Sequence, residues 1–224
     1  MEYENMVSGV FISRPNRFIA LCEIDGKTET CHVKNTGRCK ELLIKGASVY
    51  LQRAKNMSRK TAFDLIAVQK GERLINMDSQ ASNKVFYEWA VKVGIPGLTM
   101  IKPEQAYLHS RFDFYIEAGE RKIFVEIKGV TLEEEGIALF PDAPTERGIK
   151  HLRELSRCVL DGYEAMAVFV IQMHGVRGFA PNPAQPAFKE ALLSARASGV
   201  QLTAMDCIVK NNGMVLNERV KMNF

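Results

Sequence analysis

Three residues in the second half of the chain have the types and spacing of a site that cleaves phosphodiester bonds with the help of a metal. Asp113 is followed 13 positions later by Glu126, and Lys128 stands two residues further on. Two carboxylates can hold a hard divalent cation, Mg²⁺ or Mn²⁺, through oxygen. Such a cation stabilises charge on a scissile phosphate and helps to generate hydroxide, and a lysine beside it can position the attacking water. The pattern therefore predicts Asp113, Glu126 and Lys128 as catalytic residues, the first two as metal ligands.

The acid-x-lysine triplet is weak by itself, because a chain of this composition produces roughly two copies by chance. Three occur, at Asp25, Glu120 and Glu126, and only the third lies inside an apolar segment typical of a strand. Side chains alternate along a strand, so Glu126 and Lys128 share one face while Val125 and its apolar partners face the core. Charges in such a setting need partners or a metal. The alternative, a Glu–Lys pair on an exposed sheet face, stays open.

Two helices flank this strand in the sequence and could supply further side chains. The first, expected from about Ser82 to Val93, carries Glu88 as a third candidate metal ligand, although a solvated glutamate explains it as well. The second begins after Pro144. We expect Arg147 and Lys150 on it to contact the phosphates of nucleic acid, against the alternative of a solvated basic face.

Helices that alternate with apolar strands over residues 81–224 indicate an α/β sheet domain. The strands are expected at Phe112–Glu117, Lys122–Val130, Ala165–Gln172 and Val200–Val209, and a third helix at about Ala187–Ala197. The spacing of Ala195, Gly199 and Val200 also fits a helix-turn-helix, which would make the protein a transcription factor. The segment after Gly199 prefers a strand, however, and this glycine serves equally to end a helix.

Residues 1–80 predict a different architecture, an OB-fold-like β-barrel. Three strands, a short helix at Arg38–Leu43 and two further strands follow one another, which is the element order of an OB-fold. We therefore expect a domain boundary near Asp78, with a separate core on each side. The expected strands are Val7–Ser13, Phe18–Ile24, Thr28–Val33, Ser48–Ala54 and Ala62–Gln69.

Positive charge concentrates in this N-terminal half. The whole chain has a net charge of +4, and residues 34–60 hold eight basic residues against one acidic residue. A local surplus of this kind attracts the phosphate backbone of nucleic acid, DNA first of all, although a solvated basic face is the alternative. The residues expected to bind nucleic acid in this half are Arg14, Arg17, Lys34, Asn35 and Arg38.

The composition argues against several other classes of protein. No apolar run approaches the roughly 20 residues of a membrane span, and the N-terminus lacks the features of a secretory signal. Five cysteines without a CxxC pair favour neither a disulfide framework nor a zinc knuckle, and the four histidines lack metal-ligand spacing. A reducing cytoplasm, away from membranes, is the expected location. The oligomeric state stays open, with a homodimer as one option.

Five longer motifs resemble the sugar fermentation stimulation protein A family. The resemblance runs from about residue 10 to about residue 208 and implies an N-terminal OB-fold and a C-terminal domain similar to the PD-(D/E)XK nucleases. It also implies non-specific DNA binding and a role in regulating sugar-metabolism genes. The motifs are Arg14-Pro15-Asn16-Arg17-Phe18, His32-Val33-Lys34-Asn35-Thr36-Gly37-Arg38, Arg111-Phe112-Asp113-Phe114, Val125-Glu126-Ile127-Lys128-Gly129-Val130-Thr131-Leu132 and Phe140-Pro141-Asp142-Ala143-Pro144-Thr145-Glu146-Arg147-Gly148.

The positions that match the nuclease pattern are Asp113, Glu126 and Lys128, and Phe112 stands where that pattern usually has proline. Two functions therefore remain open. One is a metal-dependent nuclease with little sequence specificity, and the other is a DNA-binding regulator that keeps the nuclease fold without cleaving.

Overall fold

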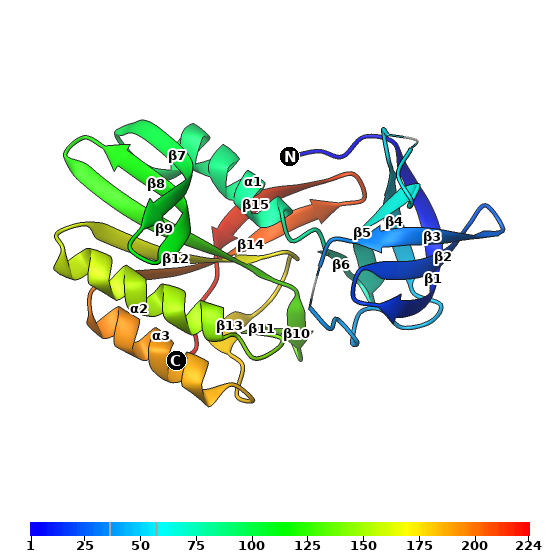
Figure 1. The fold of residues 1–224 in the computed structure, drawn as a ribbon. Helices are drawn as coiled ribbons and strands as arrows, with labels where there is room; N and C mark the ends of the chain where they lie inside the picture. The colour runs from blue at the N-terminus through cyan, green and yellow to red at the C-terminus, as the bar shows by residue number, and fades with distance from the viewer. Residues whose placement is uncertain (36, 57) are drawn as a thin grey trace.

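The computed structural model describes residues 1–35, 37–56 and 58–224, and its two halves have different architectures (Figure 1). Six strands build the first half: β1 (Met6–Asn16), β2 (Ile19–Ile24), β3 (Lys27–Val33), β4 (Ser48–Arg53), β5 (Phe63–Lys70) and β6 (Arg73–Asn76). They lie in the order β3-β2-β1-β4-β5-β6, and a parallel pairing of β3 with β5 closes the first five into a barrel. The predicted OB-fold-like barrel is therefore confirmed.

The helix predicted at Arg38–Leu43 is wrong. The segment forms turns instead, in which the N–H of Leu43 donates to the carbonyl of Cys39. Cys39 has a φ of 45°, which interrupts a right-handed helix. The guanidinium of Arg14 also donates hydrogen bonds to the carbonyls of Gly37 and Arg38, at the start of the segment. A helix would use such carbonyls as acceptors for its own backbone hydrogen bonds. Thr36, in the motif just before, lies outside the described residues.

The second half is an α/β domain, as predicted, and its main sheet has six strands where four were expected. The sheet has the order β15-β14-β12-β9-β8-β7, in which β12 runs parallel to both β9 and β14. Its strands are β7 (Leu98–Tyr107), β8 (Ser110–Ala118), β9 (Arg121–Val130), β12 (Glu164–Ile171), β14 (Gln201–Lys210) and β15 (Gly213–Arg219). A small second sheet contains β10 (Leu132–Glu134), β11 (Ile137–Phe140) and β13 (Gly178–Pro181).

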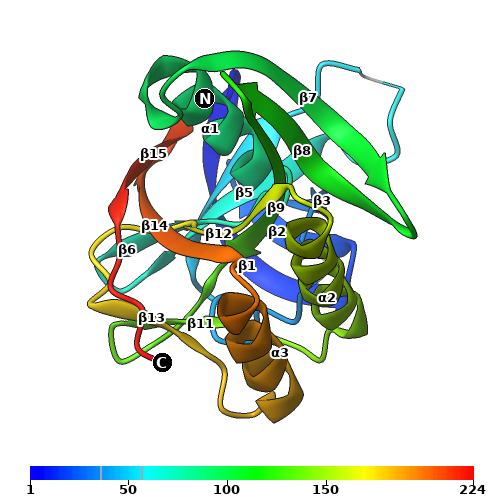
Figure 2. The ribbon, with the colours of Figure 1, turned by 90° about the vertical axis from the view of Figure 1, so that its left-hand side faces the viewer.

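Helices cover both faces of the main sheet (Figure 2). The helices are α1 (Ala81–Trp89), which continues as a π-helical turn η1 (Ala90–Gly94), α2 (Glu146–Leu160) and α3 (Pro186–Ala197). On one face α1 packs through Phe86 against a cluster that includes Val125 of β9. On the other face α2 and α3 pack through Leu155 and Leu192 against a cluster that includes Phe124 of β9.

This arrangement settles two alternatives left open by the sequence. The face of β9 that carries Glu126 is buried under α2 and is not an exposed sheet face, since Glu126 is only 4% exposed. The helix-turn-helix is also wrong. Gly199 follows α3 with a φ of 94°, as a helix-ending glycine does, and β14 begins two residues later.

Several strands were not predicted because their residues lack a clear apolar alternation. β7 is an edge strand with mostly exposed residues and contains Pro103, and β15 forms the opposite edge. The short strands of the small sheet hold three or four residues each, too few to show a period.

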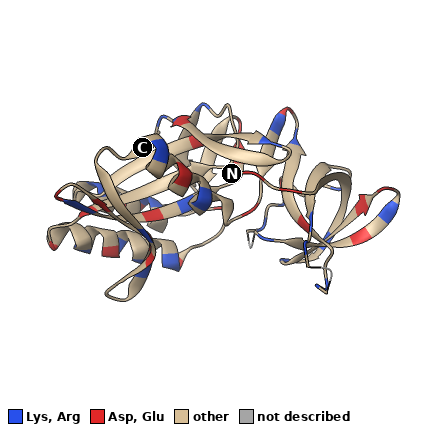
Figure 3. Ribbon diagram, turned by 90° about the horizontal axis from the view of Figure 1, so that it is seen from above, with Lys and Arg blue, Asp and Glu red and all other residues tan. Residues whose placement is uncertain are grey.

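The expectation of two separate cores is not met. One contiguous buried cluster joins residues of the barrel, such as Leu65 and Met77, to residues of the α/β domain, such as Phe169 and Phe179. Charged residues of both signs are spread over both halves (Figure 3). Among the residues that the structure describes, none of the helices has the length and apolarity that a bilayer crossing requires.

Candidate active site

Asp113 lies at a fork between two strands. β8 and β9 pair from Ala118 opposite Arg121 as far as Phe114 opposite Val125, and no pair is formed beyond that point. The side chain of Asp113 fills the gap, since its Oδ2 accepts the backbone N–H of Ile127 at 2.7 Å. Its Oδ1 accepts the side-chain amide of Asn83, on α1, at 2.8 Å. Both carboxylate oxygens are therefore fixed in place by the fold, and each keeps a lone pair for a further ligand.

Glu126 presents one occupied and one bare carboxylate oxygen. Its Oε1 accepts a hydrogen bond from Nζ of Lys128 at 2.7 Å and a second from Nδ1 of His151 on α2. Its Oε2 is fully buried and has no hydrogen-bond partner among the described residues. A buried carboxylate oxygen without a partner is costly, so this atom calls for a ligand that the protein itself does not supply.

The pKa values of the two carboxyls diverge. Burial raises the pKa of Asp113, and the negative charge of Glu126 raises it further, against smaller opposing effects of the Ile127 and Asn83 hydrogen bonds. Burial also acts to raise the pKa of Glu126, but the hydrogen bonds from His151 and Lys128, together with the positive charge of Lys128, outweigh it and lower that pKa. Two carboxylates that repel each other, one of them with a buried oxygen that lacks a hydrogen-bond partner among the described residues, fit the donor set of a hard divalent cation.

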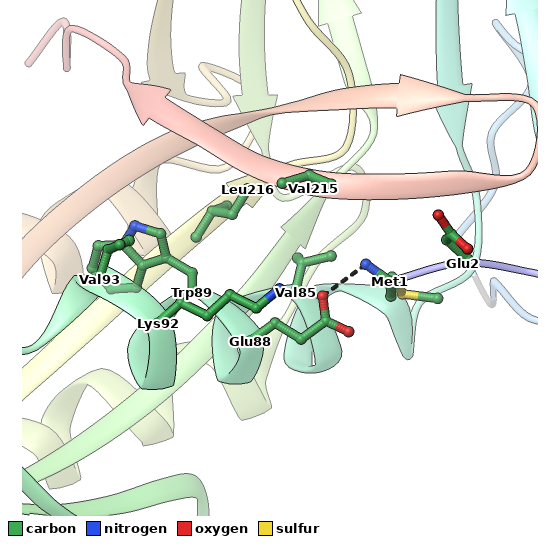
Figure 4. A pocket seen from close by; sticks show the side chains of 9 residues that line it. All are labelled: Met1, Glu2, Val85, Glu88, Trp89, Lys92, Val93, Val215 and Leu216. Atoms are coloured by element: carbon green, nitrogen blue, oxygen red, sulfur yellow. Dashed lines mark hydrogen bonds and ion pairs between the residues drawn. The ribbon is translucent and has the colours of Figure 1, made fainter.

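Glu88, the third predicted ligand, is engaged elsewhere. Its Oε2 accepts a hydrogen bond from the amino group of Met1 at 2.7 Å, at the side of a pocket of about 690 Å³ (Figure 4). The same pocket lies between α1 and β15, lined by Trp89 and Leu216 among others. Within residues 1–35, 37–56 and 58–224, no three His, Cys, Asp or Glu side chains converge as a metal site. The structure thus brings together Asp113 and Glu126 but not Glu88.

His151 is the site residue that the sequence did not point to. It is 4% exposed and lies on the buried side of α2, one turn before Leu155. The signal that could have found it is a titratable side chain at an apolar position of an otherwise amphipathic helix. Its distance of 25 residues from Glu126 hid the contact.

The predicted nucleic-acid-binding residues of α2 lie next to this histidine. Nε of Arg147 donates to Nε2 of His151 at 3.4 Å, so an exposed cation contacts the histidine that binds Glu126. Nζ of Lys150 donates to the carbonyl of His109 at 2.7 Å and remains exposed. These contacts place positive charge at the rim of the candidate site.

The five predicted residues of the barrel divide into two groups. Three are held by the protein: Arg14 donates to four backbone carbonyls, Lys34 forms ion pairs with Asp64 and Asp78 at 3.5 and 3.4 Å, and Asn35 accepts the N–H of Gly37. The other two, Arg17 and Arg38, remain exposed. They line a basic pocket of about 320 Å³ together with Arg14, Asn16, Gly37, Lys40 and Leu43.

A narrow cavity of about 100 Å³ lies between the barrel and the end of β9. Asn35 lines it from the barrel, and Gly129, which follows Lys128, lines it from β9. Gln172 also lines the cavity, and it lies so close to Gly129 that a side chain at position 129 would collide with Oε1 of Gln172. The basic loop of the barrel and the end of β9 thus border one space.

Two family models match the chain in succession. The model of the SfsA N-terminal OB domain matches residues 12–77, and that of the sugar fermentation stimulation protein RE domain matches residues 80–213. A sugar fermentation stimulation protein homolog of Desulfitobacterium hafniense (strain Y51) is 61% identical over 215 residues, covering 96% of this chain and 94% of that protein. A homolog of Clostridium beijerinckii is 54% identical over 222 residues and covers 98% of both chains.

A solved structure has the same fold. The structure of Pyrococcus furiosus SfsA in complex with Ca²⁺ is similar with a TM-score of 0.90 and 29% sequence identity, and the match covers 100% of this chain and 98% of that one. The two family models cover the barrel and the α/β domain, and the relatives match nearly the whole chain. The chain therefore belongs to the sugar fermentation stimulation protein A family.

Proposed function

We propose that this protein binds nucleic acid, DNA first of all, with little sequence specificity and cleaves its phosphodiester bonds with a divalent cation, Mg²⁺ or Mn²⁺. The observation that carries the proposal is the buried Oε2 of Glu126, which has no hydrogen-bond partner among the described residues and whose carboxylate lies close to that of Asp113. The cation, when bound, would neutralise the scissile phosphate and lower the pKa of water. That a family member has been solved in complex with Ca²⁺ supports the proposal, because Ca²⁺ also takes oxygen ligands.

Each residue of the candidate site would have a distinct role in binding or cleavage. Asp113 and Glu126 hold the cation, and Lys128, whose Nζ is 2.7 Å from Glu126, orients the attacking water. Arg147, Lys150 and the exposed basic residues of the barrel hold phosphates, which gives affinity without reading the sequence. We further propose that one strand of nucleic acid contacts both halves, and the proposal is supported by the exposed basic residues that each half carries: Arg17 and Arg38 in the barrel, and Arg147 and Lys150 on α2.

A second candidate function is a DNA-binding regulator of sugar-metabolism genes that does not cleave. Two observations favour it. Only two carboxylates converge among the described residues, and Lys128 is tied to Glu126 in an ion pair. Either feature would suit a nuclease fold that keeps DNA binding after losing turnover.

A cleavage assay separates the two functions. Labelled single-stranded DNA, double-stranded DNA and RNA are incubated with the protein in Mg²⁺, Mn²⁺ or EDTA. If the protein is a nuclease, we expect cleavage in Mg²⁺ or Mn²⁺ by the wild type and none by Lys128→Ala. Lys122→Ala is the matched control, because Lys122 lies on the same strand in a second acid-x-lysine triplet and is exposed. Binding of DNA without cleavage in either metal would leave the regulator as the function.

A further inference from the structure

We infer that His151 is a positioning residue for the cation site, and that it fixes the Glu126 carboxylate so that Oε2 is the oxygen presented to the cation. The inference rests on the proposed function, because it assigns a role toward the cation that Asp113 and Glu126 would hold. It concerns a residue of α2 that approaches the carboxylate from the face opposite α1.

The proton arrangement of His151 follows from its two neighbours. A guanidinium only donates hydrogen bonds, and Nε of Arg147 points at Nε2 of His151 across 3.4 Å. Nε2 is therefore the accepting nitrogen, and the proton stands on Nδ1. Nδ1 faces Oε1 of Glu126 and donates to it. Arg147, His151 and Glu126 thus form a chain in which each donor points toward the carboxylate.

Packing holds this chain rigid. His151 is 4% exposed, and its ring meets the ring of Phe112 edge to face, with centroids 6.0 Å apart and planes at 75°. Phe112 directly precedes Asp113, so the same aromatic contact ties the histidine to the segment of the second carboxylate. The imidazole has little room to rotate, and its donor is aimed at one oxygen of Glu126.

The two donors to Glu126 are not equivalent. Lys128 and His151 both donate to Oε1, which is why Oε2 stays bare. Lys128 has a flexible, unbranched side chain, and the proposed function assigns it to the attacking water. When its ammonium group turns to that water and leaves Glu126, His151 is the donor that keeps the carboxylate in its orientation. Outer partners of this kind commonly contribute a factor of 10 to 100 in metal affinity.

The test measures Mn²⁺ binding by calorimetry on the full chain, without nucleic acid. His151→Leu keeps the bulk but removes the donor, and we expect its Mn²⁺ dissociation constant to rise about 10- to 100-fold. His151→Asn places an amide N–H close to the position of Nδ1, and we expect it to restore affinity to within a few-fold of wild type. His109→Leu is the matched control and should bind as wild type does, since His109 is exposed and only its backbone carbonyl takes part in a hydrogen bond.

Circular dichroism in EDTA shows whether His151→Leu is folded. If it is not, a variant at Arg147 tests the same inference. Removing an exposed cation near the site should on charge alone strengthen Mn²⁺ binding. We expect Arg147→Gln to weaken it instead, because His151 loses the partner at Nε2. Unchanged affinity in a folded His151→Leu, no recovery in His151→Asn, or tighter binding in Arg147→Gln would each overturn the inference. A wild-type chain that binds no Mn²⁺ at millimolar concentration would overturn the proposed cation site itself.

Discussion

The carboxylate of Asp113 accepts the backbone N–H of Ile127 across 2.7 Å, at the point where β8 and β9 stop pairing. A side chain here takes the place of a strand-to-strand hydrogen bond. The position of the carboxylate is therefore set by the sheet and does not depend on a bound cation. A site built this way is preorganised, and the cation would meet ligands already in place.

Asp113→Asn should remove most of the cation-dependent stabilisation. A cation at 100 times its dissociation constant stabilises the folded state by about 2.7 kcal/mol, which for a chain of this size raises the melting temperature by roughly 5 to 10 °C. Without cation the variant should be as stable as wild type or more so, because burial and Glu126 disfavour the ionised form of Asp113. Its amide can keep both hydrogen bonds if Asn83 flips.

Thermal melts in Mg²⁺, Mn²⁺ and EDTA check this expectation. Asp25→Asn is the matched control, since Asp25 is exposed in a turn with a φ of 50° that asparagine also tolerates. A full cation-dependent rise in Asp113→Asn would show that Asp113 is not a ligand.

The spacing of residues along the chain was enough to predict the site residues on two adjacent strands, but it did not predict the residue that a helix contributes. Asp113, Glu126 and Lys128 belong to one hairpin, so a local pattern could predict them together. His151 comes from α2, 25 residues further along the chain, and only the tertiary packing brings it to Glu126.

Counting charged residues likewise predicted only part of the basic surface of the barrel. It predicted a basic stretch, but it could not tell Arg38, which stays exposed, from Arg14, whose guanidinium binds four backbone carbonyls. Two of those carbonyls, of Gly37 and Arg38, lie at the start of the segment predicted as a helix, so the contacts of Arg14 also bear on that error. The edge strand β7 was missed for a different reason, since an edge exposes both of its faces and shows no alternation.

The salt dependence of DNA binding should distinguish the two kinds of basic residue. Arg38→Ala and Lys40→Ala remove exposed cations from the basic pocket and should each shallow the slope of log affinity against log salt by roughly 0.9. Arg14→Ala and Lys34→Ala should instead lower the melting temperature, because the first removes four hydrogen bonds to backbone carbonyls and the second removes the ion pairs to the buried carboxylates of Asp64 and Asp78.

Fluorescence anisotropy over a salt series gives these slopes. Lys27→Ala serves as the control, since Lys27 is an exposed lysine of the same barrel outside the basic stretch. Equal slopes in wild type and Arg38→Ala would mean that the basic pocket does not contact phosphate.

Gln172→Leu should destabilise both halves of the protein together. The buried Nε2 of Gln172 donates to the carbonyls of Asn76 and Asp78, each at 3.0 Å, and so ties β6 and the start of α1 to the end of β12. Leucine removes both of these buried hydrogen bonds, which costs about 2 to 4 kcal/mol. The melting temperature should fall by roughly 5 to 15 °C.

Far-ultraviolet circular dichroism and the fluorescence of Trp89, the single tryptophan, follow the whole chain and the α/β domain respectively. The two probes should report one transition in wild type. Gln80→Leu is the control, because Gln80 is exposed and its side chain does not cap α1. Wild-type stability in Gln172→Leu would contradict the role assigned to the amide.

The ion pairs of Glu133 should give the protein part of its stability at neutral pH. Glu133 lies on β10, and its buried carboxylate binds Lys70 at 2.8 Å and Arg73 at 3.3 Å, both from the barrel. Burial alone would raise the pKa of Glu133, but the hydrogen bonds from Lys70 and Gly136 and the charges of Lys70 and Arg73 lower it. The folded pKa is thus below the unfolded one. The stabilisation is present above the unfolded pKa, about 4.3, and is lost as the pH falls through the folded value.

Glu133→Gln should therefore destabilise the protein by roughly 1 to 3 kcal/mol at neutral pH, a range kept low because Lys70 and Arg73 are about one-third exposed. Below the folded pKa the two proteins should converge, so the variant's melting temperature should fall less steeply than that of wild type between neutral pH and about pH 3. Glu134→Gln, which changes the exposed neighbour, should follow the wild-type curve. Parallel curves for wild type and Glu133→Gln would mean that these ion pairs between the barrel and the α/β domain do not stabilise the fold.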